Sequence, residues 1–226
     1  MHKTCALDQN HLMLTTFVVE TPHGPARVHL HEAEAPHAAL VLGHGAGGGV
    51  AAPDLVATKD VALEEGFAVA LVEQPYRVAG RRSPAPAHQL DGAWTAVLER
   101  LRGDELAGLP LLAGGRSSGA RVACRTAEAT GAVGVLCLAF PLQPPGRSTP
   151  SRLPELDGVH VPMLVVQGAG DPFGMPPPGS GRKVVAVRGN HSLRSDIASL
   201  REAVREWLRE RGAARAAAPL RARPST

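Results

Sequence analysis

The stretch "LLAGGRSSGAR", Leu111–Arg121, decides the fold and directs the search for a function. Its apolar start predicts a strand, residues 115–119 match the pattern G-x-S-x-G, and a helix is expected to follow. In that pattern the serine stands on a sharp strand-to-helix turn, which lifts its hydroxyl above the carboxyl edge of a sheet. We therefore predict Ser117, and not Ser118, as a nucleophile with a helix N-terminus beneath it. The competing interpretation is that Ser117 is only a helix N-cap.

The rest of the chain alternates between expected strands and helices. Residues 11–21 and 26–33 predict a hairpin that turns at "PHGP". Helical spacing predicts one helix with Asp54 as its N-cap and Gly66 beyond its end, and a closing helix from Leu193 to Leu208. A third helix is expected at 87–103. The continuous apolar run at 38–45 is typical of a strand buried on both faces, and 67–77 is the next expected buried strand. Further strands are expected at 132–140, 161–171 and 183–191.

This order predicts an α/β fold with a mostly parallel sheet, helices on both faces and an N-terminal antiparallel hairpin. Pro- and Gly-rich segments at 141–158 and 172–182 are expected to be loops. The length of 226 residues suits one domain. We expect that domain to span residues 1–211, and residues 212–226 to form a flexible Ala/Arg/Pro tail.

Composition restricts the class of partner. The formal net charge is +3, and the tail carries Arg215, Arg221 and Arg223 without an acid, so the remainder is formally neutral. A neutral body argues against nucleic acid as a partner. No apolar run approaches the roughly 20 residues of a membrane span, and residues 1–10 lack the apolar core of a signal peptide. We therefore expect a cytoplasmic protein that binds neither nucleic acid nor membrane; nothing in the sequence fixes its oligomeric state.

A serine nucleophile needs a base, and the base needs an orienting carboxylate. Asp171 directly follows the apolar run "MLVVQGAG", and His191 directly follows "VVAVRGN". Both positions are carboxyl ends of expected strands, where open α/β sheets place their sites. We predict a Ser117–His191–Asp171 triad. A turn role for Asp171 and a plain loop role for His191 are the alternatives; the rivals Asp157, Asp196 and His160 do not directly follow an apolar strand.

The glycine-rich loop "GHGAGGG", residues 43–49, admits two interpretations. Gly43, Gly45 and Gly48 spell G-x-G-x-x-G, a dinucleotide signature, and Glu73 stands where a ribose-binding acid would lie. However, a dinucleotide-binding helix should begin at the glycines, whereas here the loop continues to Asp54. We therefore predict that the Ala46 and Ser118 amides form an oxyanion hole. His44 is expected to anchor the loop.

The motifs "GHGAGG", "PYRVAG", "GGRSSGAR", "QGAGDPFG" and "GNHSL" together resemble a small bacterial α/β-hydrolase family related to dienelactone hydrolases. The same subfamily includes the hydrolase-like domain of an animal chromatin-complex subunit. The resemblance covers about residues 15 to 210. It implies an α/β-hydrolase fold without a lid domain, with Ser117, Asp171 and His191 as the triad and Ala46 and Ser118 as oxyanion donors.

Further polar residues lie near the predicted site. Tyr76 and Arg77 follow a strand and are candidate substrate contacts, and Arg77, Arg81 and Arg82 are either anion-binding or plain surface arginines. Arg116 and Arg121 are expected to pair with structural carboxylates. The odd cysteine count without C-x-x-C, and the scattered His29, His31 and His37, suggest neither a disulfide framework nor a metal site.

Together these features predict a serine hydrolase that cleaves a small ester or thioester without a cofactor. The alternative is a catalytically idle scaffold that binds a protein partner, since fold does not imply function. A dinucleotide-dependent oxidoreductase is the third hypothesis, and it leaves Ser117, Asp171 and His191 unexplained.

Overall fold

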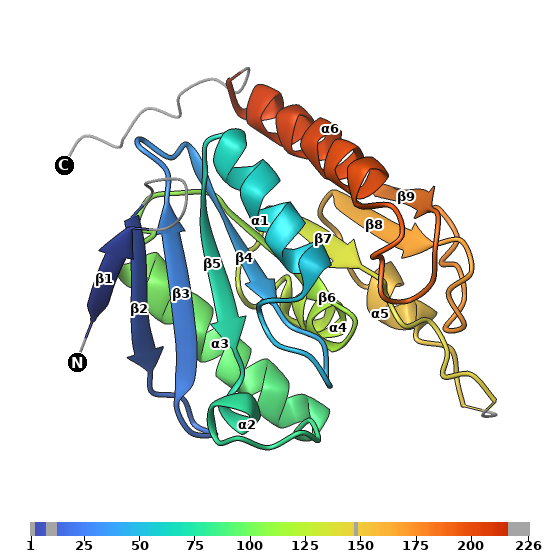
Figure 1. Cartoon of the computed structure of the whole chain (residues 1–226), viewed down its shortest axis with the longest axis horizontal. Coiled ribbons are helices and arrows are strands. Elements are labelled where there is room, and N and C mark those ends of the chain that lie inside the picture. The colour runs from blue at the N-terminus through green and yellow to red at the C-terminus, as the bar shows by residue number, and fades with distance from the viewer. Residues whose placement is uncertain (1–2, 8–12, 147–148, 217–226) are drawn as a thin grey trace.

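The computed structural model describes residues 3–7, 13–146 and 149–216, and one central sheet organises them (Figure 1). Within these residues the sheet has nine strands in the order β1-β2-β3-β5-β4-β6-β7-β8-β9. Their bounds are β1 (Thr4–Leu7), β2 (Met13–Val19), β3 (Ala26–Glu32), β4 (Ala38–Gly43), β5 (Phe67–Glu73), β6 (Leu111–Arg116), β7 (Gly134–Leu138), β8 (Met163–Gly168) and β9 (Arg182–Val187).

The sheet divides into an antiparallel edge and a parallel body. β2 and β3 form the predicted hairpin, with Met13 opposite Glu32 and Val19 opposite Ala26. β1, which was not predicted, pairs with β2 as a further antiparallel strand, so the antiparallel edge is larger than a hairpin. From β5 through β4, β6, β7 and β8 to β9 every pairing is parallel, as predicted.

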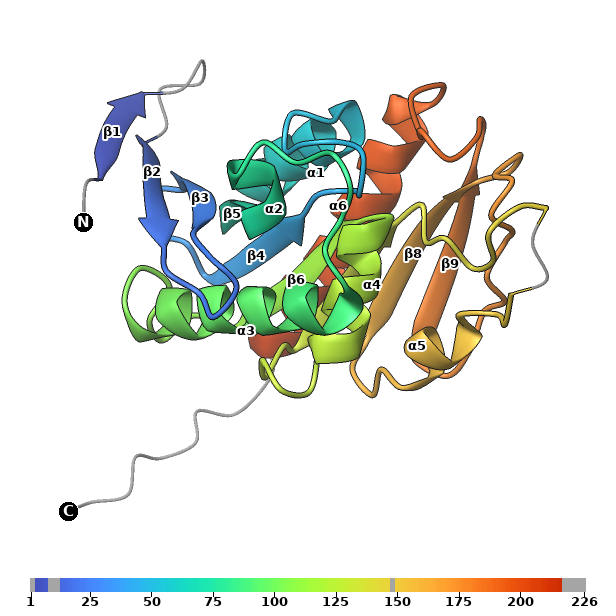
Figure 2. The ribbon, with the colours of Figure 1, turned by 90° about the horizontal axis from the view of Figure 1, so that it is seen from below.

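Helices cover both faces of the sheet, as Figure 2 shows from below. α1 (Pro53–Glu64) and α6 (Ile197–Ala216) lie together on one face, and α3 (Ala87–Gly103) and α4 (Ser118–Thr126) lie on the other. β4, β5, β6, β7 and β8 are therefore buried on both sides, which explains their apolar sequences. The edge strand β9 is only partly buried. All six residues of β4 are buried.

The helical spacing of apolar residues predicts the buried faces well. α3 has the predicted bounds, and it buries Trp94, Leu98 and Leu101 against the sheet. Gly66 follows α1 with a φ of +77°, a backbone conformation that favours glycine, so it ends the helix as predicted.

The prediction for the start of α1 is wrong. Ala52 occupies the N-cap position and Asp54 is the second residue of the helix, with no side-chain cap. Asp54 turns inward instead, is fully buried, and forms an ion pair with Arg116. Asp54 therefore binds Arg116, a residue distant in sequence, and does not cap the helix as the local capping rule predicts.

Three helical segments differ from the sequence interpretation. α2 (Pro75–Val78) follows β5 where a continuing strand was expected, and α5 (Leu153–Asp157) lies within the expected loop 141–158. The closing helix α6 begins at Ile197 and not at Leu193 as predicted, because Leu193 has a φ of +52° and precedes the helix. α6 continues past Arg211 to Ala216, so residues 212–216 of the expected tail are helical. Residues 217–226 of that tail lie outside the described residues.

Candidate active site

Ser117 occupies a strained turn between β6 and α4. Its φ of +52° and ψ of −108° lie outside the regions that L-residues favour, and its amide donates to the Leu138 carbonyl at 2.9 Å. Non-glycine residues remain in such conformations only where the surrounding structure enforces them. Here α4 packs so closely on β4 that a Cβ atom at Gly119 would overlap the Gly43 carbonyl group. The turn therefore requires the glycine that the G-x-S-x-G pattern supplies.

The three predicted site residues form one hydrogen-bonded chain. The Ser117 hydroxyl oxygen Oγ lies 3.0 Å from His191 Nε2, and His191 Nδ1 lies 2.8 Å from Asp171 Oδ2. A carboxylate accepts hydrogen bonds, so His191 Nδ1 carries the proton on that side, and Nε2 is left to accept from the serine. The strands β6, β8 and β9 end at the same edge of the sheet, which brings the three loops together.

Asp171 is held from several sides, and its side chain is fully buried. Its Oδ1 accepts the Phe173 amide at 2.9 Å, and its Oδ2 also accepts from Gln167 Nε2 at 2.8 Å. The same Gln167 amide group lies within 3.0 Å of the Phe140 and Gly174 carbonyl oxygens. Sequence reasoning missed Gln167, although a buried polar residue inside the apolar run "MLVVQG" was a signal for it.

The rival residues do not join this chain. Asp157 pairs with Arg182 at 2.9 Å, and Asp196 pairs with Arg188 at 3.2 Å and accepts the Ser199 amide near the start of α6. His160 lies between α5 and β8.

The glycine-rich loop does not open a helix. α1 begins at Pro53, several residues after the glycines, which is contrary to the geometry of a dinucleotide site. Glu73 is also engaged within the protein, because it accepts from Arg27 Nη1 at 3.0 Å and lies 3.3 Å from His29 Nε2. Hydrogen bonding with His29 and Arg27 lowers the pKa of Glu73 to about 2. A ribose hydroxyl would have to displace these partners.

The side chains of His44 and Tyr76 fix the glycine-rich loop. His44 Nδ1 donates to the Gly45 carbonyl at 2.8 Å, and its Nε2 accepts the Gln74 amide at 3.1 Å. Burial lowers the pKa of His44, in keeping with this neutral form. The prediction that His44 anchors the loop is confirmed. The Tyr76 hydroxyl donates to the Ala46 carbonyl at 2.9 Å, a link that sequence reasoning did not foresee.

The backbone amides of Ala46 and Ser118 are both free to donate. Within the described part of the chain, neither amide has a hydrogen-bond acceptor. Ser118 opens α4, so its amide points along the helix axis toward the region of Ser117. On the facing side, a Cβ atom at Gly45 would lie 3.5 Å from Ser117 Cβ, which places the glycine loop directly beside the serine.

One family model matches most of the chain. The model of a family described as an alpha/beta hydrolase domain matches residues 36–207. The chain belongs to the alpha/beta hydrolase family. The match runs from the residues before β4 into α6, so it contains the three strand-end loops and the glycine-rich loop. No curated protein matches the sequence.

Several solved structures share the fold at low identity. XC6422 from Xanthomonas campestris, described as a serine hydrolase without a lid, has a TM-score of 0.70 and 20% identity over 87% of this chain and 94% of its own. Est1E from Butyrivibrio proteoclasticus has a TM-score of 0.71 and 14% identity over 88% and 99%. A dienelactone hydrolase from Anabaena variabilis has a TM-score of 0.69 and 14% identity over 88% and 98%.

An open groove lies beside His191 in this alpha/beta hydrolase. The Phe173 ring contacts the His191 ring with a centroid distance of 4.4 Å. Phe173 also lines a space of about 430 Å³ together with Leu142, Gln143, Pro144, Pro145, Gly146, Pro172 and Gly174. None of the described residues that line this space is charged, so this part of its wall suits an uncharged group.

The two candidate substrate contacts lie differently from each other. Tyr76 is only 2% exposed, and its hydroxyl is bound to the Ala46 carbonyl, so it supports the glycine loop from within. Arg77 is partly buried and its Nη1 lies 3.4 Å from the Arg81 carbonyl. A role for Arg77 in contacting substrate stays a prediction.

The two arginines near Ser117, Arg116 and Arg121, pair with carboxylates, as predicted. Arg116 Nε lies 2.9 Å from Asp54 Oδ2, and Arg121 makes two hydrogen bonds to Glu155. On the other side of α4, Cys124 and Cys137 are buried free thiols with their sulfur atoms 3.5 Å apart.

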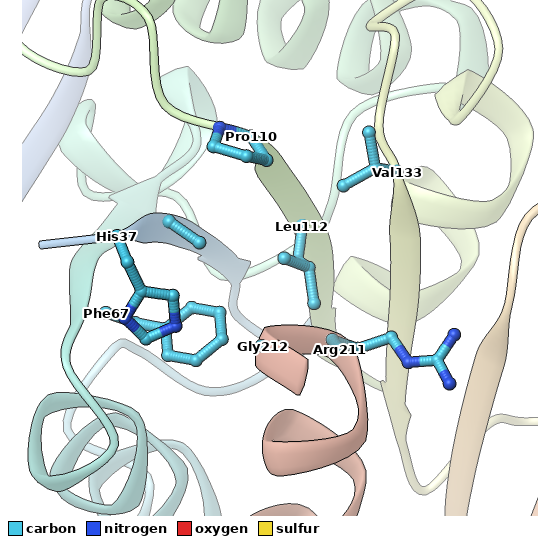
Figure 3. Close-up of a pocket in the computed structure, with 8 residues that line it drawn as sticks. His37, Phe67, Pro110, Leu112, Val133, Arg211 and Gly212 are labelled. Carbon is cyan, nitrogen blue, oxygen red and sulfur yellow. The ribbon is translucent and has the colours of Figure 1, made fainter. Parts of the chain in front are cut away.

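A second pocket, of about 410 Å³, lies at the opposite edge of the sheet (Figure 3). Its walls come from the amino ends of β4, β5 and β6 and from the end of α6, and they include Phe67, Leu112 and Val133.

The described residues contain no group of three or more His, Cys, Asp or Glu placed to hold a metal. They also contain no helix that is long and apolar enough to cross a membrane.

Proposed function

We propose that this alpha/beta hydrolase cleaves a small carboxylic ester or thioester through an acyl-enzyme on Ser117. The observation that carries the proposal is the hydrogen-bonded chain from Ser117 Oγ through His191 to Asp171. A serine hydroxyl is a weak nucleophile by itself, and a histidine that accepts its proton activates it. The carboxylate holds the imidazole in the required tautomer and stabilises the imidazolium that forms.

The reaction then has two steps. Ser117 Oγ attacks the substrate carbonyl carbon while its proton moves to His191 Nε2, and the tetrahedral intermediate collapses as His191 protonates the leaving alcohol or thiol. A water molecule gives its proton to His191 Nε2 and attacks the acyl carbon. The acid product leaves, and the proton returns to Ser117.

The Ala46 and Ser118 amides are the proposed donors to the oxyanion. Their lack of other acceptors within the described residues supports this role. A donor that is fixed before the reaction stabilises the developing charge without reorganisation, by about 3 kcal/mol for each donor. His44 and Tyr76 bind the carbonyls on either side of the Ala46 amide, so they hold that donor in place.

The groove beside Phe173 is the proposed site for one of the two substrate groups. The described residues that line it carry no charge, which supports an uncharged and partly apolar group against this part of the wall. Est1E, one of the structural neighbours, has been solved with ferulic acid bound. An ester with a small neutral acyl group is therefore a suitable first substrate.

Hydrolysis of p-nitrophenyl acetate tests the proposal. Ser117→Ala should lose at least about 10³-fold in kcat, because the nucleophile is removed. Ser180→Ala, which removes a hydroxyl from an exposed loop residue before β9, is the matched control and should retain wild-type activity. Full activity of Ser117→Ala would contradict the assignment of the nucleophile.

The idle-scaffold alternative gives a different result in the same assay. A wild type that hydrolyses no p-nitrophenyl ester and binds no serine-directed inhibitor would favour it. The link to the chromatin-complex subunit and the cytoplasmic location stay predictions.

A further inference from the structure

Arg116 stands at the point where three loops of the site meet. It is the last residue of β6 and directly precedes Ser117. Its guanidinium group contacts Asp54 at the start of α1 through Nε at 2.9 Å. Through Nη2 it donates to the backbone carbonyl of His191 at 3.0 Å. A Cβ atom at Gly45 would lie 2.8 Å from Nη1, so the glycine loop rests directly against the same group.

The partner Asp54 makes this arrangement rigid. Its side chain is 1% exposed and its Oδ1 also accepts the Leu55 amide at 3.0 Å. Burial raises the pKa of Asp54, while the charge of Arg116 opposes that effect. The N-terminus of α1 further favours an anion at this position. The guanidinium of Arg116 is therefore engaged on two sides, by the Asp54 carboxylate near Nε and by the His191 carbonyl at Nη2, and its planar shape fixes the angle between these two contacts.

The contacts of Arg116 also restrain the distance between the nucleophile Ser117 and the base His191. Asp171 holds the imidazole ring of His191 at Nδ1, and the loop backbone is held at Gly189 and Asn190, whose carbonyls accept the amides of Gly170 and Leu193. Arg116 adds a bond to the His191 carbonyl itself from the residue next to Ser117, so a short path joins the backbone of the nucleophile to the backbone of the base. Because Gly45 precedes Ala46, the same guanidinium also limits where the Ala46 amide can lie.

We propose that the Asp54–Arg116 pair is a positioning device that sets the His191 loop and the glycine loop relative to Ser117. This inference rests on the proposed function. It assigns a role to the variable residue before the serine in the G-x-S-x-G pattern. Arg116 itself does not touch the reacting atoms.

Arg116→Lys is the decisive variant. Lysine keeps a positive charge for Asp54, but it lacks the planar fork that reaches His191 at the same time. Arg121→Lys is the matched control, because Arg121 also makes a partly buried pair, with Glu155, away from these loops. Asp54→Asn is a second variant that frees the guanidinium from its anchor, and it should act in the same direction as Arg116→Lys.

Two measurements are compared across these variants: the rate of inactivation by a fluorophosphonate, and amide hydrogen exchange. Arg116→Lys should lower the maximal inactivation rate roughly 10- to 100-fold, since misplacement by about 1 Å costs that much. The inhibitor concentration at half-maximal rate should stay unchanged. Exchange should increase in peptides that contain residues 44–50 and 189–193. Arg121→Lys should show neither effect.

Each other outcome has a distinct meaning. Wild-type inactivation rates in Arg116→Lys would overturn the positioning role. A rate loss shared equally by Arg121→Lys would also overturn it, because the effect would then be general. A wild type that does not react at all contradicts the proposed function instead, and exchange in the two loops then decides whether Arg116 holds them.

Discussion

His191 Nε2 lies 3.0 Å from Ser117 Oγ, although 74 positions separate the two residues in the chain. They meet because β6 and β9 are parallel strands of one sheet whose carboxyl ends face the same way. The turn at Ser117 and the loop at His191 both extend beyond that edge. Sheet topology thus creates the contact, and local restraints on each residue set its distance.

Asp171→Asn should lower kcat for p-nitrophenyl acetate by about 10²- to 10⁴-fold while KM changes little. An amide in place of the carboxylate allows the wrong tautomer of His191 and no longer stabilises its charged form. Asp157→Asn, which removes the charge of a half-exposed carboxylate paired with the buried Arg182, is the control and should retain activity. Equal losses in both variants would contradict the role of Asp171.

Tyr76→Phe should lower kcat about fivefold, which corresponds to the net value of one hydrogen bond. The lost bond is the one from the Tyr76 hydroxyl to the Ala46 carbonyl. Burial raises the pKa of Tyr76 to about 12, so the hydroxyl is a donor at every pH below that value. The ratio of kcat between wild type and variant should therefore be constant from pH 7 to pH 9. A ratio of one would show that the Ala46 loop does not depend on this bond.

Gly119→Ala should destabilise the protein by about 1–3 kcal/mol or prevent its folding, since the new methyl group would overlap the Gly43 carbonyl. Gly47→Ala is the matched control, because no atom lies within 4 Å of the position its Cβ would take. That variant should change the free energy of unfolding by less than about 0.5 kcal/mol. Denaturant titration measures both; equal stability of the two variants would contradict the close packing of α4 on β4.

Glu73→Gln should change how stability depends on pH. The pKa of Glu73 is about 2 in the folded protein, below its ordinary value of 4.5, because His29 and Arg27 bind the ionised form. As pH falls from 4.5 toward 2, the unfolded chain takes up this proton first, so the free energy of unfolding decreases over that range. The decrease should be smaller in Glu73→Gln than in wild type. Glu34→Gln, a change at an exposed glutamate, should follow the wild type.

The sequence predicted those parts of the fold that depend on local pattern. The α3 bounds, the β2–β3 hairpin and the parallel body follow from apolar spacing and turn residues. The Asp54 prediction failed because the capping rule reads only neighbours in the chain, while Arg116 is a tertiary partner. α2 and α5 are too short to show a helical period.

At the site, too, local sequence pattern predicted some features, and contacts between distant residues determined the others. Ser117, Asp171 and His191 could be placed because each lies close after the carboxyl end of a strand, and parallel strands share an edge. Gln167, the support from Tyr76 and the reach of Arg116 depend on side-chain directions between elements distant in sequence. No spacing rule encodes those directions, so these contacts emerged only from the structure.

The most direct test of the proposed nucleophile is the mass-spectrometric location of a fluorophosphonate adduct on the wild-type protein. The reagent phosphonylates an activated serine and leaves a stable mass increase on one residue. We predict a single adduct on Ser117, and none when Ser117→Ala is treated in the same way. An adduct on another residue, or an unmodified protein under conditions that label a known serine esterase, would contradict the account.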